Sequence, residues 1–319
     1  MNHTVSRVRP EGATLSVIVP VYFNADSLPL LFDELRKFES SLDELKMKLE
    51  IVFVDDGSGD SSFDLLMEFR RHRPGTKVVR LSRNFGASAA TRAGHTFVTG
   101  DCFFYLSADL QDPLDHVIEM VHYWLQGEKF VISARATRDD PAPTKFYAAL
   151  FYRLVRLGIT SDYPSGGIGL MLMDKVMLPF MTNSPHKINL NMYAHWLGFH
   201  PKQLTYDRIK RAKGRSRWTF GRKVQYFIDT FTGFSPIPLR AMSALGLFIA
   251  FLSVIYAATV FVAALSGSIA VTGFAALAVL TSFLGGCILF MLGVIGEYLW
   301  RIFVQVSGRP DAIVDELHI

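Results

Sequence analysis

Two long apolar segments near the carboxyl end constrain this chain more than any other feature. Residues 241–265 contain no charged side chain, and residues 269–296 are again uncharged after a short polar break. The hydrocarbon core of a bilayer is about 30 Å thick and requires about 20 apolar residues per helix. Soluble helices of this length carry a polar stripe, which both segments lack. The sequence therefore predicts a hairpin of two transmembrane helices.

The basic residues beside these segments predict how the hairpin is oriented. Arg222, Lys223 and Arg240 precede it, Arg301 and Arg309 follow it, and the connection between the segments has no Lys or Arg. Basic flanks remain on the cytoplasmic side of a membrane. We therefore expect a multi-pass protein of the inner (cytoplasmic) membrane whose large amino-terminal part is cytoplasmic.

Composition excludes several other classes of protein. Half of the 319 residues are apolar and 19% are charged, which is too hydrophobic for a disordered chain or a simple soluble enzyme. The net charge is only +4, and its distribution along the chain is more informative than its total. The two cysteines, Cys102 and Cys287, exclude a disulfide framework and favour a reducing compartment.

Short apolar runs alternate with amphipathic stretches in the first two thirds of the chain. This alternation predicts βαβ units and a mostly parallel, Rossmann-like α/β sheet covered by helices on both faces. Ligands bind to such sheets beyond the carboxyl ends of the strands. We expect strands at 15–20, 49–54, 77–81, 102–106 and 130–134, and helices at 27–42, 61–71, 87–98 and 114–125.

Polar motifs follow four of these strands. Each motif by itself is typical of a turn or a helix N-cap. Four polar loops at one edge of a sheet are better explained by a ligand site. The motifs are residues 20–24 (PVYFN), 55–58 (DDGS), 82–86 (SRNFG) and 107–113 (SADLQDP).

These four motifs, in this order, resemble the family 2 glycosyltransferases with a GT-A fold. More narrowly, they are similar to the polyprenyl-phosphate glycosyltransferases, which include bactoprenol-phosphate glucosyltransferases and dolichyl-phosphate mannose synthases. The resemblance covers about residues 14–310 and includes the basic stretch 208–218 and the segment 296–301. It implies a GT-A domain over 1–217, a juxtamembrane amphipathic segment over 218–238, a two-helix hairpin over 239–300 and a cytoplasmic tail over 301–319.

The resemblance implies an inverting transferase. Its donor would be a nucleotide-sugar, with UDP-glucose favoured, and its acceptor polyprenyl (undecaprenyl) phosphate at the cytoplasmic face. The product would be a lipid-linked monosaccharide for cell-surface glycans. Membrane lipids, a second copy of the chain and a downstream flippase or membrane glycosyltransferase are expected partners, and nucleic acid is not. Two alternatives stay open: a hydroxyl-bearing lipid acceptor, or a catalytically degenerate relative that acts as a binding or scaffold protein.

The first two motifs are predicted to bind the donor nucleotide. By resemblance, the turn with Pro20, Tyr22 and Asn24 lies over the nucleotide. Asp55 and Asp56 would accept hydrogen bonds from the base or ribose, which suits ionised carboxylates because they are acceptors only.

The fourth motif is predicted to hold a divalent cation. The family has an Asp-x-Asp pair followed by Gln, and here Ser107 replaces the first Asp. Asp109 and Gln111 therefore remain as donor-binding ligands for Mg²⁺ or Mn²⁺, which prefer oxygen and take up charge on the leaving diphosphate. Asp112 either supports the metal ligands without touching the metal or caps the helix that follows, and we favour the cap.

Basic residues are predicted to bind phosphates. The resemblance implies that Arg135 contacts the donor and, with Asp109 and Arg211, contributes to catalysis. The polybasic stretch precedes the first apolar segment, so anionic lipid is its nearest partner. The residues assigned to the phosphate or lipid acceptor are Arg138, Arg208, Arg211, Lys213, Ser216, Arg217 and Lys223.

The chain departs from the family pattern at Ala25, Gly169 and Met171, where members commonly carry Glu, Asp and Arg. The missing acid at Gly169 matters most, because a hydroxyl acceptor needs a positioned base. A phosphate monoester has a second pKa of about 6 and is largely ionised at neutral pH, so it needs none. We therefore expect the nearby carboxylates of Asp162 and Asp174 to be dispensable for turnover.

Overall fold

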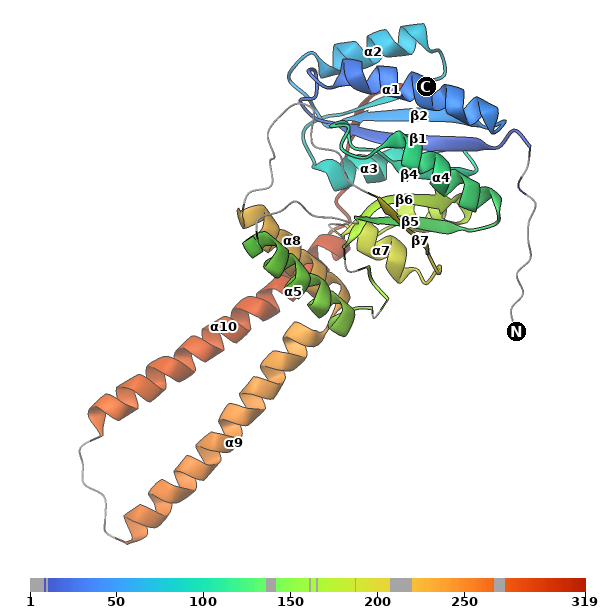
Figure 1. The fold of residues 1–319 in the computed structure, drawn as a ribbon. Coiled ribbons are helices and arrows are strands. Elements are labelled where there is room, and N and C mark those ends of the chain that lie inside the picture. Colours follow the sequence, from blue (N-terminus) through green and yellow to red (C-terminus); the bar gives the residue numbers. More distant parts are fainter. Residues whose placement is uncertain are drawn as a thin grey trace. The chain divides into compact units, whose positions relative to one another are not determined.

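Eight strands form one mixed sheet in the part of the chain that the structure describes (Figure 1). The structure is a computed structural model that describes residues 9, 11–135, 142–160, 162–164, 166–186, 188–206, 220–266 and 273–319. The order of strands across the sheet is β7-β5-β6-β4-β1-β2-β3-β8. The strands are β1 (Thr14–Val21), β2 (Lys48–Asp55), β3 (Lys77–Leu81), β4 (Cys102–Tyr105), β5 (Phe130–Arg135), β6 (Ile168–Asp174), β7 (Lys202–Tyr206) and β8 (Val314–His318).

Helices connect most of these strands. The five strands and four helices expected in the first 134 residues are all present, with ends that differ by a few residues. The helices are α1 (Leu28–Glu44), α2 (Ser62–His72), α3 (Ala87–His95), α4 (Leu114–Leu125), α5 (Ala142–Gly158), the 3₁₀ turn η1 (Lys175–Met177), α6 (Leu178–Thr182), α7 (Leu190–Trp196), α8 (Phe220–Phe234), α9 (Ile237–Leu265) and α10 (Phe274–Val306).

The central strands of the sheet are parallel, as expected. Strand β1 pairs in parallel with β2 and β4, and β3 pairs in parallel with β2. Strand β6 is antiparallel to both β4 and β5, and β8 is antiparallel to β3. The fold class is therefore confirmed as a mostly parallel α/β sheet. Its parallel centre places the ends of β1, β2, β3 and β4 at one edge.

Alternation along β1 explains how both faces of the sheet are covered. Leu15, Val17 and Val19 belong to a buried cluster that also contains residues of α1 and α4. Ile18 points to the opposite face and lies against Gly94 of α3. Because successive strand residues face opposite sides, one apolar run serves two helical layers.

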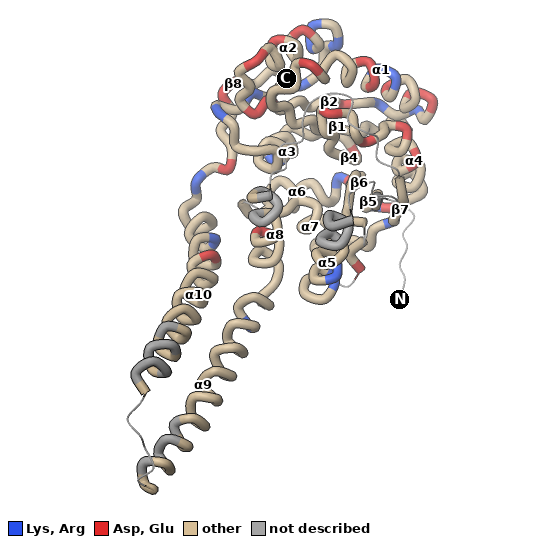
Figure 2. The backbone as a smooth tube through the Cα atoms, turned by 60° about the vertical axis from the view of Figure 1, so that its left-hand side comes forward, with Lys and Arg blue, Asp and Glu red and all other residues tan. Residues whose placement is uncertain are grey.

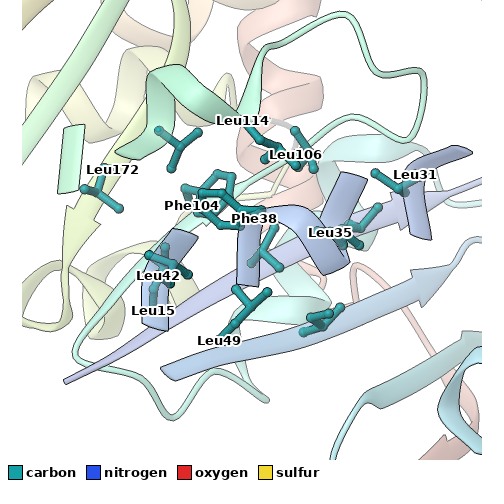
Figure 3. Packing of buried hydrophobic residues seen from close by; sticks show 14 of the residues in the cluster. Leu15, Leu31, Leu35, Phe38, Leu42, Leu49, Phe104, Leu106, Leu114 and Leu172 are labelled. Carbon is teal, nitrogen blue, oxygen red and sulfur yellow. The ribbon is translucent and has the colours of Figure 1, made fainter. Parts of the chain in front are cut away.

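Helix α1 supplies a large share of the buried cluster. Its residues at helical spacing, Leu31, Leu35, Phe38 and Leu42, point toward the strands (Figure 3). Phe38 meets Phe104 of β4 edge to face, with ring centroids 6.1 Å apart. Burying a side chain of this size contributes about 1.5–3 kcal/mol, so this layer holds the sheet rigid behind its functional edge.

Strand β8 was not expected from the sequence. The chain divides into two compact units, residues 1–227 with 310–319, and residues 228–309. The carboxyl-terminal residues thus belong to the same unit as the sheet, where β8 extends the edge beside β3. Arg80 of β3 forms an ion pair of 2.9 Å with Glu316 of β8, and Arg92 of α3 pairs with Asp311 at 2.9 Å.

The second unit contains the two long apolar helices. The candidate membrane spans are Ile237–Tyr256 and Phe283–Val306, each with mostly exposed side chains. The described residues of α9 and α10 are almost free of charge along most of their length (Figure 2). Near the carboxyl end of α10, Arg301 forms a 2.5 Å ion pair with Asp229 of α8. By length and composition, both helices can cross a membrane.

Gly57 is required where two loops at the functional edge meet. Its φ is +68°, and an added Cβ would lie 2.7 Å from the main-chain carbonyl carbon of Arg83. Gly75 has φ +92° with nothing within 4 Å of an added Cβ, so it is a matched control.

We expect Gly57→Ala to lower stability more than Gly75→Ala. Both substitutions place a side chain in left-handed backbone, at a cost of about 1–2 kcal/mol. Gly57→Ala adds a steric conflict of about 1–3 kcal/mol. Thermal unfolding of the full chain in detergent measures the difference, and equal melting temperatures for the two variants would show that the loops do not meet tightly.

Candidate active site

Asn24 organises the turn between β1 and α1. Its side-chain Oδ1 accepts a hydrogen bond from the Tyr22 main-chain amide at 3.0 Å, and its main-chain amide donates to Ser62 Oγ at 2.9 Å. Its main-chain carbonyl oxygen accepts from the amides of Ser27 and Leu28. The predicted donor-binding residue Asn24 therefore shapes the loop that would cover a nucleotide.

Phe23 also lies in this turn, although no pattern in the sequence marks it as a donor-binding residue. It adopts φ +52°, its amide donates to Ser58 Oγ at 3.1 Å, and its side chain is 45% exposed. Tyr22 meets it edge to face, with ring centroids 4.7 Å apart. An exposed aromatic ring on a left-handed residue at a polar edge is a suitable surface for stacking. Its left-handed backbone conformation, which is visible only in the structure, is what distinguishes Phe23 from other exposed phenylalanines.

Asp56 ties the end of β2 to the start of α3. One carboxylate oxygen accepts from the Phe85 amide at 2.7 Å, and the other accepts from the Gly86 amide at 2.9 Å. The Asp56 amide donates to the carbonyl of Val21, which ends β1. One residue thus connects three of the four loops that carry the motifs.

Asp55 is fully buried beside it. Its carboxylate accepts from the Ser58 amide at 3.3 Å and lies 3.7 Å from the Arg80 guanidinium. Burial raises the pKa of Asp55 and of Asp56, and this exceeds the opposing effect of the amide donors and of the nearby arginines. The oxygens predicted to bind base or ribose are therefore bonded to the protein's own groups.

The Asp109–Gln111 turn presents two oxygen-bearing side chains. Leu110 between them adopts φ +55°, and the Gln111 amide approaches Asp109 Oδ1 at 3.4 Å. Both side chains are partly exposed. The carboxylate and amide oxygens fit Mg²⁺ or Mn²⁺, which take oxygen ligands and retain water or substrate phosphate at their other positions. Among the described residues, no cluster of three or more His, Cys, Asp or Glu side chains could hold a metal by itself.

Asp112 does not cap helix α4 as predicted. The N-cap position of α4 falls on Pro113. The Asp112 carboxylate instead accepts a hydrogen bond of 2.6 Å from the hydroxyl of Tyr206 at the end of β7. This pairing joins residues 94 positions apart, which local sequence patterns do not reveal.

Most of the predicted phosphate-binding residues cannot be placed. Arg135 is the last residue of β5 and pairs in register with Tyr206 of β7, and Lys223 lies in α8. The others lie outside the described residues: Arg138, Arg208, Arg211, Lys213, Ser216 and Arg217.

Asp174 and Asp162, the two acids nearest to Gly169 in the sequence, both bond to other side chains of the protein. Asp174 ends β6 opposite Cys102 at the start of β4, so it lies at the edge of the sheet away from the motifs. Its carboxylate pairs with Arg9 at 2.5 Å and accepts from Trp124 Nε1 at 2.9 Å. Asp162 is more exposed and accepts from His195 and Thr160.

Sequence comparison identifies the family. The profile described as glycosyl transferase family 2 matches residues 16–176, which include strands β2 to β6 and the four motif loops. The chain belongs to this family and is a glycosyltransferase. It is 32% identical to an uncharacterized glycosyltransferase of Synechocystis, with 95% of each chain covered. It is 29% identical to a prophage-derived bactoprenol glucosyl transferase of Shigella flexneri, with 95% of this chain and 98% of the relative covered.

A solved structure has the same fold. The mannosyltransferase of Pyrobaculum calidifontis, in complex with GDP-mannose and Mn²⁺, superposes with a TM-score of 0.50 at 18% identity, over 93% of this chain and 91% of the other. At this identity the similarity establishes the fold alone.

Asp174→Asn is expected to destabilise the protein and Asp162→Asn to have little effect. Removing the Asp174 charge leaves Arg9 partly buried without its partner, which costs about 3–5 kcal/mol. Asp162 is exposed enough that its loss costs less than about 1 kcal/mol. The activity of each variant per folded molecule should remain near wild type, and a loss of activity with an unchanged melting temperature would place that acid in catalysis.

The stability difference between wild type and Asp162→Asn is expected to depend on pH. The Thr160 hydroxyl and the His195 ring lower the pKa of Asp162 to about 2. A lowered acid pKa contributes stability above the ordinary value of about 3.9, and that contribution is lost as the pH falls through about 2. Any difference in melting temperature between wild type and Asp162→Asn should therefore disappear toward pH 2.

Proposed function

We propose that this chain transfers a single sugar from a nucleotide-sugar to polyprenyl phosphate. The observation that carries this proposal is near full-length similarity to a protein named bactoprenol glucosyl transferase, because it includes the apolar hairpin as well as the sheet. UDP-glucose is the favoured donor and undecaprenyl phosphate the favoured acceptor. The reaction would take place at the cytoplasmic face of the inner membrane, with the hairpin as anchor, because basic residues flank the hairpin.

The proposed reaction is a single displacement with inversion. An acceptor phosphate oxygen attacks the anomeric carbon, the bond from that carbon to the donor diphosphate breaks, and the nucleoside diphosphate leaves. The ionised acceptor needs no protein base. Asp109 and Gln111 would hold a divalent cation, which stabilises charge on the leaving diphosphate.

The chain's own residues orient the donor in this proposal. The Asn24 turn and the exposed Phe23 ring form the nucleotide-binding edge, and Asp56 keeps the adjoining loops at a fixed separation. Preorganised loops of this kind lower the entropic cost of bringing the reactants together. Arg135 and the basic residues that follow β7 would bind the phosphates of donor and acceptor.

The alternative of a non-catalytic scaffold rested on Gly169, Ser107 and Ala25, which replace residues common in the family. Asp109 and Gln111 on one ordered turn favour the enzyme instead, because a scaffold has no need to retain paired metal ligands.

The direct test is incubation of the purified full chain with undecaprenyl phosphate, Mn²⁺ and a panel of nucleotide sugars. We expect the mass of the lipid to increase by one hexose with one donor. Binding of a nucleotide without any lipid product would favour the scaffold, and product on a hydroxyl-bearing lipid only would contradict the phosphate acceptor.

Asp109→Asn should lose most turnover while the protein keeps its fold. The substitution removes the one carboxylate assigned to the metal and hardly changes the shape of the side chain. Excess Mn²⁺ should restore part of the rate if the defect is a lost ligand. Asp115→Asn, on the exposed first turn of α4, is the matched control and should behave as wild type. Unchanged turnover in Asp109→Asn would rule out the metal assignment.

A further inference from the structure

Tyr206 occupies the space beside Gly169. A Cβ added at Gly169 would lie 2.3 Å from the Tyr206 hydroxyl oxygen and 2.7 Å from Cε1 of its ring. The ring is 5% exposed and stacks on His116, with centroids 5.3 Å apart and planes inclined by 18°. No side chain larger than hydrogen fits at position 169 while Tyr206 keeps this position. The glycine at position 169, where family members commonly carry an acid, is therefore required by the position of Tyr206.

The Tyr206 hydroxyl is directed at the candidate metal turn. It donates to Asp112 Oδ1 at 2.6 Å. Asp112 follows Gln111 directly and precedes Pro113, whose ring restricts the backbone, so little freedom remains between Asp112 and the turn. Leu110 is already held at φ +55°, a conformation that costs a non-glycine residue energy and persists only when its surroundings fix it.

Tyr206 also stands at the start of the polybasic stretch. It is the last residue of β7, in register with Arg135 at the end of β5, and residues 207–219 follow it directly in the chain. One side chain therefore connects the strand that leads into the basic residues with the turn that carries Asp109 and Gln111.

We propose that Tyr206 is a positioning residue that holds the Asp109–Gln111 turn in its metal-binding conformation through its hydrogen bond to Asp112. Gly169 is needed because it gives the tyrosine ring room. This inference rests on the proposed function, since it assumes that the turn binds the metal of the donor complex. It assigns Asp112 the role of hydrogen-bond acceptor, without contact to the reacting atoms.

The test is Tyr206→Phe in the full chain in detergent. Phenylalanine keeps the ring against Gly169 and His116 and removes only the hydroxyl. Mn²⁺ binding in the presence of UDP, or of GDP in a parallel titration, is followed by the loss of the free Mn²⁺ signal in electron paramagnetic resonance. We expect the Mn²⁺ dissociation constant to rise about tenfold, as for a lost hydrogen bond to a charged group. Tyr193→Phe, a partly exposed tyrosine on α7, is the control and should bind as wild type.

Two substitutions at Asp112 separate positioning from direct action. Asn keeps a carbonyl oxygen that can accept from Tyr206, so Asp112→Asn should stay within about twofold of wild type. Ala removes the acceptor, so Asp112→Ala should match Tyr206→Phe, and the double variant should be no weaker than either. If Asn and Ala weaken Mn²⁺ binding equally, the charge of Asp112 acts directly and the positioning role is wrong.

Gly169→Ala gives an independent test from the other side of the ring. It should weaken Mn²⁺ binding about as much as Tyr206→Phe, because the methyl group displaces the tyrosine. Unchanged binding in either variant, with a melting temperature near that of wild type, would overturn the inference. The inference would also be overturned if the wild-type protein bound no Mn²⁺ with either nucleotide.

The readout keeps this inference separate from the proposed function. Absence of a lipid product from wild-type protein would contradict the transferase reaction and leave the metal titration interpretable. A product from wild-type protein, together with Mn²⁺ binding that does not change in Tyr206→Phe, would contradict the inference alone.

Discussion

The bonds between the Asp56 carboxylate and the amides of Phe85 and Gly86 are the constraint that fixes three of the four motif loops relative to one another. Parallel strands bring four polar loops to one edge, but hydrophobic packing does not determine how far apart those loops lie. The buried Asp56 carboxylate fixes this separation by accepting hydrogen bonds from two amides, because leaving either donor without a partner is costly. The close approach of Gly57 to Arg83 is a consequence of the same arrangement.

This constraint changes how the two aspartates of the second motif are understood. Both are typical donor-binding residues by resemblance, yet in this chain their oxygens bond to protein groups and burial raises both pKa values. A carboxylate oxygen has more than one acceptor position, so an additional bond to a nucleotide is compatible with this geometry. Asp55 and Asp56 therefore hold the loops in place before any donor binds.

The elements were predictable because their signals are local. Apolar runs of strand length predicted β1 to β5, and uncharged segments of more than 20 residues predicted α9 and α10. The spacing of Asp109 and Gln111 likewise placed both on one turn. Strand β8 was not predictable in this way, since its pairing with β3 joins residues separated by more than 230 positions. The same applies to Asp174, whose partners Arg9 and Trp124 are distant in sequence.

The sequence by itself determined the class of fold, the two membrane-length helices and the family, because hydrophobic periodicity and motif order are properties of neighbouring residues. Only the tertiary structure decided which polar side chains at the strand ends bond to the protein's own groups, as those of Asp55 and Asp56 do. Gly169 illustrates the difference: in the sequence it is a missing acid, and in the structure it is the space that the Tyr206 ring requires. The physical reason is that a hydrogen bond such as that from Tyr206 to Asp112 depends on how distant strands pack, which no local pattern contains.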